Sequence, residues 1–145
     1  MNKIEIIENH FRVYKNLVNK INLKNMELIK LKEDWYNVSG IRFDDVKIKG
    51  GIPYDIADQM HFIVEKEEEL KAIINYKEEL KRVHENEINT LTEHNKRTVL
   101  KLFYLDKCSI KEIAYCLRIT EGHVKKLKRW AVDDFINKVI DKDGE

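Results

Sequence analysis

The chain has 145 residues and a formal net charge of +1, because 27 Lys and Arg residues nearly balance 26 Asp and Glu residues. This length suits one domain, or one small domain with an extended part, and the near-neutral charge excludes a general polycation, so any nucleic-acid-binding surface must be local. A hydrophobic content of 43% can support a core, while 37% charged residues with one Pro and five Gly favour helices over an all-β fold.

Targeting, redox and metal signals are weak throughout the chain. Neither a signal peptide nor a long apolar run is visible, so we expect a cytoplasmic protein without a membrane partner. The two cysteines, Cys108 and Cys116, lack a C-x-x-C spacing, and the five histidines show no zinc-ligand spacing, so no metal or other cofactor is predicted. Cys116 falls within an amphipathic helix and is predicted to be a small residue of its core.

The first predicted element is one long helix over residues 2–35. Its apolar residues recur three and four positions apart, which is the pattern of a heptad seam. About 30 helical residues would span about 45 Å. The seam is formed by Ile4, Ile7, Phe11, Tyr14, Val18, Ile21 and Leu28, and Asn25 is predicted to occupy one of its positions.

Residues 37–52 form a predicted connector that contains Ser39-Gly40 and Gly50-Gly51. Between these pairs the residues alternate between apolar and polar, as they would in a strand. A single strand has no sheet to join, so we expect a loop. Pro53 suits the first turn of the helix that follows.

The second long helix is predicted over residues 54–91. Its apolar stripe consists of Ile56, Met60, Ile63, Leu70, Ile73, Ile74, Leu80, Val83, Ile88 and Leu91. Glu67 and Lys77 interrupt this stripe. The two long helices are predicted to pair antiparallel. Packing within one monomer and self-association into a dimer both remain open.

The C-terminal part has the pattern of a helix-turn-helix preceded by one further helix. Residues 95–105 are amphipathic, and Val99, Leu102 and Phe103 are predicted to pack over the two helices that follow. Ser109 and Glu112 can form a capping box, and Thr120 is a candidate N-cap. Arg118 lies in the turn, where a left-handed backbone conformation is needed, and a non-Gly residue there costs about 1 kcal/mol.

The second helix of this motif is basic. Its residues away from the core face are Glu121, Gly122, His123, Lys125, Lys126, Lys128 and Arg129. The N-terminal turn of such a helix normally meets base edges in a major groove. Amphipathic helix pairs with a basic surface also occur in bundles that bind no nucleic acid, so a purely structural unit is the alternative.

Apolar residues continue beyond the basic helix. Phe135, Ile136, Val139 and Ile140 are predicted to dock on the long helices, and residues 141–145 to fray. The sequence therefore predicts an all-α fold with two domains. Residues 1–91 form a long antiparallel helical hairpin with the connector, and residues 92–145 form a trihelical helix-turn-helix unit.

The run from Arg97 to Ala131 resembles region 4 of sigma factors of the sigma-70 class. The shared positions are Val99-Leu100, Phe103-Tyr104, Ile110, Glu112-Ile113-Ala114, Thr120, Val124, Lys125 and Ala131. Most of the chain is similar to phage-encoded sigma-like transcriptional regulators of the RinA/ArpU type, in which a helical segment and a Gly-containing connector precede such a motif. Arg118 departs from the pattern, which usually has Gly there, and no promoter-melting region is visible.

The resemblance implies a sequence-specific regulator of phage or prophage genes that binds double-stranded DNA, with host RNA polymerase as a further partner. By position, the residues that would face the bases are Glu121, Gly122, Lys125 and Lys126, and Thr120, His123 and Arg129 would contact phosphates or flanking positions. Long basic side chains early in a groove-bound helix can reach guanine acceptors, and a helix N-terminus favours phosphate.

Two other classes of function are alternatives to a DNA-binding regulator. A phage small terminase subunit, which assembles the DNA-packaging machinery, also joins a helix-turn-helix to helices that oligomerise, so it is the alternative function. An enzyme is not expected, because the sequence contains no nucleophile–base pair, no Gly-rich phosphate loop and no set of metal ligands.

Overall fold

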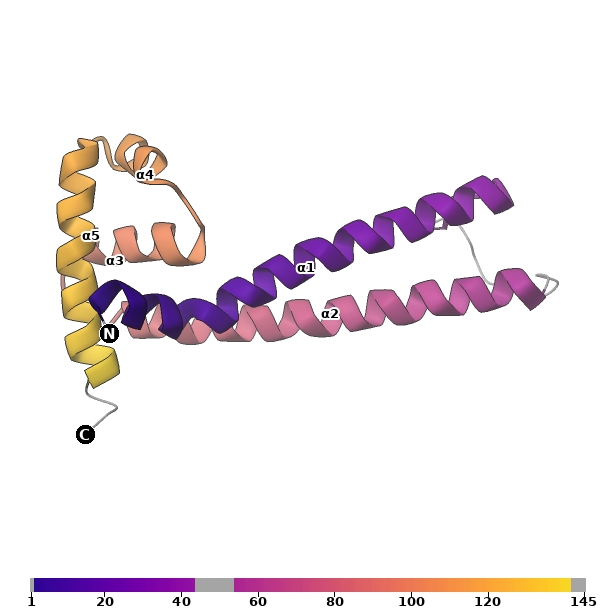
Figure 1. The fold of residues 1–145 in the computed structure, drawn as a ribbon, viewed down its shortest axis with the longest axis horizontal. Helices are drawn as coiled ribbons and strands as arrows, with labels where there is room; N and C mark the ends of the chain where they lie inside the picture. The colour runs from indigo at the N-terminus through magenta and orange to yellow at the C-terminus, as the bar shows by residue number, and fades with distance from the viewer. Residues whose placement is uncertain (1, 44–53, 142–145) are drawn as a thin grey trace. The chain divides into compact units, whose positions relative to one another are not determined.

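In a computed structural model, which describes residues 2–43 and 54–141, the protein is all-α, as predicted. Two long helices, α1 (Lys3–Ser39) and α2 (Tyr54–Ile88), precede a cluster of three helices, α3 (His94–Leu100), α4 (Ile110–Leu117) and α5 (Glu121–Phe135) (Figure 1). One π-helical turn extends α3 through Lys101–Leu105, and another extends α5 through Ile136–Ile140. The predictions for most of the connector, for Pro53 and for fraying at residues 142–145 lie outside the described residues.

Packing divides the chain into two compact units. The first joins Met1–Asn16 to Glu78–Glu145 and is called the C-terminal unit below; the second is Leu17–Lys77 and is called the hairpin unit. The divisions therefore fall inside the long helices, whereas the boundary predicted from the sequence lies at residue 91. The reason is that His10 and Phe11 in the first turns of α1 pack on Phe135, and His84 in the last turns of α2 packs on the same two rings of α1.

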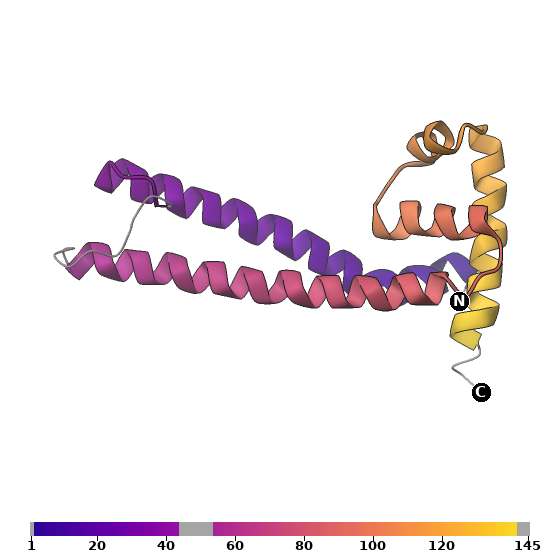
Figure 2. The same ribbon diagram turned by 180° about the vertical axis from the view of Figure 1, so that it is seen from behind.

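In the hairpin unit, α1 and α2 run antiparallel and side by side (Figure 2). Ion pairs join Lys24 to Glu69 and Lys32 to Glu67, each at 3.8 Å, so residues later in α1 meet residues earlier in α2. The core of this unit consists of Leu28, Trp35, Met60, Ile63 and Leu70, with Ile21, Leu31, Phe43 and Ile74 packed against it.

In each long helix, one residue predicted to lie on the buried apolar face was wrong by one position. Asn25 is exposed while Lys24 is half-buried, and Val83 is exposed while His84 is buried. An ideal helix drifts by about 20° per heptad relative to a strict seven-residue repeat, so the buried stripe moves to the neighbouring position along a long helix. Ile4, at the start of the predicted seam, is also 44% exposed.

The three C-terminal helices, α3, α4 and α5 (Figure 1), share one apolar core. Val99 from α3, Ile113 and Ala114 from α4, and Val124 and Leu127 from α5 form its buried centre. Leu102, Phe103, Cys108, Ile110, Leu117 and Ile119 pack around them. The prediction that Val99, Leu102 and Phe103 cover the two motif helices is confirmed.

The second half of α5 packs on the first turns of α1. Phe135 is fully buried, and its ring centroid lies 5.4 Å from that of Phe11 and 5.3 Å from that of His10. Phe11 also stacks on Tyr104, with centroids 5.1 Å apart. The predicted docking of Phe135 on a long helix is therefore confirmed.

Among the residues that the structure describes, no helix is both long and apolar enough to span a membrane.

Candidate nucleic-acid interface

The turn between α4 and α5 has the local geometry that the sequence predicts. Ser109 Oγ accepts from the amide of Glu112 at 3.1 Å, and the Glu112 carboxylate accepts from the amide of Ser109 at 3.4 Å, which completes the capping box. Arg118 ends α4 in the left-handed region, at φ 57° and ψ 44°. Thr120 Oγ1 then accepts from the amide of His123 at 3.1 Å and begins α5.

The inward face of α5 is fixed by Val124 and Leu127, which are 0% and 6% exposed. Because these residues are three positions apart, the remaining positions of the first turns point outward. All seven residues predicted to contact DNA are exposed: Thr120, Glu121, Gly122, His123, Lys125, Lys126 and Arg129. The structure therefore brings them together on one end of one helix.

Gly122 is not required by the packing of the chain. A Cβ atom built at this position would meet nothing within 4 Å, and the residue is helical. Glycine costs a helix about 1 kcal/mol relative to alanine. The open space beside Gly122 therefore leaves room for the backbone of α5 to approach a ligand closely.

Lys128 behaves differently from its basic neighbours. Its Nζ lies 3.8 Å from the centroid of the Phe103 ring and 5.8 Å from that of Tyr104, so it makes cation–π contacts within the protein. Burial lowers the pKa of this ammonium group. Lys128 therefore joins α5 to the helix that precedes the motif, a role that the sequence pattern did not indicate.

The second half of α5 carries acids that are paired within the protein. Lys96 Nζ donates to Asp134 Oδ2 at 2.6 Å, and this hydrogen bond raises the pKa of the lysine. Lys3 Nζ lies 2.8 Å from Asp133 Oδ1. The exposed cations Lys125, Lys126 and Arg129 precede these paired acids along α5.

The prediction that Cys116 is a core residue was wrong, because its side chain is exposed. Ile113 and Ala114 are buried and Leu117 is half-buried, so these three residues occupy the inward face of α4. Cys108, in the segment before α4, is half-buried and packs against the core instead. Burial raises the pKa of its thiol.

A second polar cluster in the C-terminal unit escaped the sequence analysis. His10 Nε2 on α1 lies 3.0 Å from both carboxylate oxygens of Glu87, and His84 Nδ1 lies 2.7 Å from Glu87 Oε1. Burial lowers the pKa of His84, although its hydrogen bond to Glu87 acts in the opposite direction. His10 and Glu87 are 77 positions apart, so no local motif could have indicated this cluster.

The family described as "Protein of unknown function (DUF1492)" matches residues 37–136 of the chain. The chain belongs to the DUF1492 family. The DUF1492 match contains the whole of α2, α3, α4 and α5, and hence every predicted DNA-binding residue. It also contains His84 and Glu87 but not His10. No curated protein and no solved structure matches the chain.

Proposed function

We propose that this protein is a sequence-specific DNA-binding regulator of transcription that places the first turns of α5 in a major groove. The observation that supports this function best is the exposed group at the start of α5, where Lys125, Lys126 and Arg129 lie beside Gly122. The capping bonds at Ser109 and Thr120 and the buried core beneath hold this group in place. A preorganised helix of this kind presents donors for guanine acceptors and phosphates.

The proposal also covers the target promoters, the protein partner and the residues that contact the bases. The resemblance to region 4 of sigma factors and to RinA/ArpU-type regulators points to phage or prophage promoters, with host RNA polymerase as a second partner. Base contacts are assigned to Glu121, Gly122, Lys125 and Lys126. Selection of bound fragments from the host and phage genomes by the purified protein tests this assignment, because a sharp consensus upstream of a gene is expected. Fragments without any consensus would contradict it.

The Lys125→Ala/Lys126→Ala double variant is expected to bind the selected site at least roughly 30-fold more weakly, because two lost base contacts at about 1–3 kcal/mol each sum to at least about 2 kcal/mol. The fold should be preserved, since both side chains are exposed. Fluorescence anisotropy with a labelled duplex measures the affinity, and the thermal unfolding midpoint checks the fold.

The matched control for the double variant is Lys20→Ala/Lys71→Ala, which removes two exposed lysines from the hairpin unit and changes the net charge by the same amount. This control is expected to retain nearly the affinity of the wild type. Equal affinities for the Lys125/Lys126 variant and the wild type would show that α5 is not the recognition helix.

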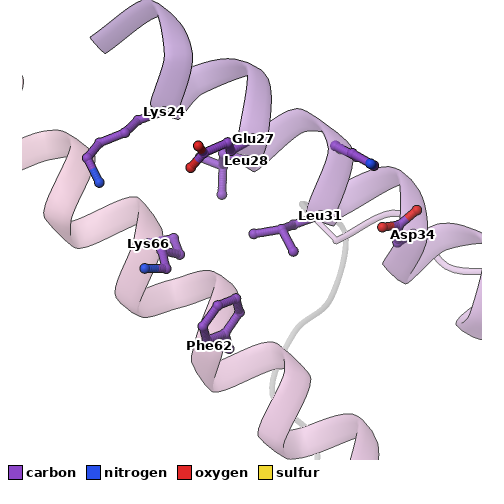
Figure 3. A pocket seen from close by; sticks show the side chains of 8 residues that line it. Lys24, Glu27, Leu28, Leu31, Asp34, Phe62 and Lys66 are labelled. Carbon is purple, nitrogen blue, oxygen red and sulfur yellow. The ribbon is translucent and has the colours of Figure 1, made fainter. Parts of the chain in front are cut away.

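We also propose that the long helices form a homodimer, which would let two recognition helices read two half-sites. Leu23, Met26 and Ile29 recur along one side of α1 and are 62%, 67% and 51% exposed. A groove of about 500 Å³ lies between α1 and α2 in the same unit. Figure 3 shows Leu28 and Leu31 of α1 lining it opposite Phe62 and Lys66 of α2. Burial of these apolar side chains would favour association.

Light scattering at micromolar concentration is expected to give twice the 17.4 kDa mass of one chain. A Met26→Glu/Ile29→Glu variant should be monomeric, because two charges would be buried in the interface. The Tyr76→Glu control, at an exposed position of α2, should remain dimeric. A monomer mass for the wild type, unchanged by DNA, would exclude the dimer, and a ring of many subunits would favour the terminase alternative.

A further inference from the structure

The side chains of His10, His84 and Glu87 converge from two helices within the C-terminal unit. One ligand-type atom from each residue lies within 4.8 Å of the others. His84 is buried, and the side chains of His10 and Glu87 are 24% and 21% exposed. The cluster is therefore shielded by protein while it keeps access to solvent along one side.

These three residues form a nitrogen- and oxygen-rich set that suits a transition metal. Two imidazoles and one carboxylate are the ligands of a common class of zinc site, in which a fourth position is left open. Zinc ligands at about 2.0 Å from the ion lie roughly 3.3 Å from one another. Small rotations of three side chains would convert the present hydrogen-bonded spacing into that arrangement.

The hydrogen bonds within the cluster do not satisfy all of its polar atoms. An ionised Glu87 can only accept, so both imidazoles must donate to it. His84 Nε2 is then buried without a hydrogen-bond partner among the described residues. Buried polar atoms normally have partners, so an ordered water molecule is expected at His84 Nε2 with or without an ion in the cluster.

We propose that His10, His84 and Glu87 bind a divalent transition metal ion of the zinc class. The imidazoles present one ring nitrogen each, and their remaining protons move to the other ring nitrogens. Glu87 supplies an anionic oxygen, and a water molecule occupies the fourth position. The ion joins the first turns of α1 to the last turns of α2, next to Phe135 at the end of α5, because the His10 ring lies 5.3 Å from the Phe135 ring.

The metal-free full-length protein is expected to bind one zinc ion per chain. Competition with a chromophoric chelator measures the affinity, and thermal unfolding provides an independent measurement. At a free zinc concentration one hundred times the Kd, the midpoint should rise by about 10 °C, because the ion binds the folded state. Neither measurement depends on DNA, so it tests this site separately from the proposed function.

The informative variant is His10→Gln, which removes the ligand that is most exposed and keeps a side chain able to donate to Glu87. Its zinc affinity should fall at least ~10-fold, while its melting point without metal stays close to that of the wild type. His94→Gln is the matched control, because His94 is exposed in the same unit outside the cluster. Glu87→Gln should lower the zinc affinity by a similar factor.

Two results would overturn the metal site. One is a wild-type protein that binds no zinc. The other is equal zinc binding by the wild type and the His10→Gln variant, which would place the ion on other residues such as Cys108 or Cys116. Repeating the titration with Cys108→Ser/Cys116→Ser excludes thiolate binding, and this variant should keep the full affinity if the proposal is correct.

Discussion

Ile113→Asp is expected to unfold the helix-turn-helix and its supporting helix. Ile113 is fully buried between α3, α4 and α5, where an unpaired carboxylate has neither solvent nor a positive partner. Such a charge costs several kcal/mol, which is a large share of the total stability of a small domain. Far-ultraviolet circular dichroism should show partial loss of helix, since the core of the hairpin unit uses other residues.

The matched control is Tyr115→Asp, which introduces the same charge two residues further along α4. Tyr115 is 86% exposed, so its replacement should change the unfolding free energy by less than about 0.5 kcal/mol. A complete loss of helix in Ile113→Asp would mean that both units unfold as one cooperative structure. An unchanged spectrum would contradict the core position of Ile113.

Phe135→Ala should lower the free energy of unfolding by about 3–5 kcal/mol, which is the usual cost of removing a buried Phe side chain. Phe135 is fully buried and contacts the rings of His10 and Phe11. Removing the ring would leave a cavity and abolish the contact between the end of α5 and the first turns of α1. The thermal midpoint should fall by on the order of 10 °C.

Trp130→Ala is the control for Phe135→Ala, because Trp130 lies on the same helix and is 45% exposed. Trp130→Ala should lower the free energy of unfolding much less than Phe135→Ala does, although it removes a larger side chain. Equal destabilisation by both substitutions would mean that the effect arises from α5 itself rather than from its contact with α1. Full stability in Phe135→Ala would contradict that contact.

The local structure of the motif could be predicted from the sequence because short-range chemistry determines it. The capping box of Ser109 and Glu112, the N-cap at Thr120 and the left-handed Arg118 are each set by residues within a few positions of one another. The exposed position of the seven candidate DNA contacts follows equally from the 3.6-residue period, once Val124 and Leu127 are assigned to the core.

Errors arose where the period had to be followed along a long helix. Asn25 and Val83 were placed in the seam, but Lys24 and His84 lie closer to it. A small angular drift accumulates over many turns, so a position far from the start of the pattern cannot be assigned reliably. Cys116 was misplaced for a related reason, because a small residue fits either face of a short helix.

The sequence by itself determined the all-α class, the two long helices, and the caps and turn of the helix-turn-helix. Those features depend on residues close together in the chain. Only the tertiary structure decided that the ends of α1 and α2 share a compact unit with the motif, and that Lys128 packs on Phe103. It also decided that His10 meets His84 and Glu87, because the packing of separate helices sets the contacts between distant residues.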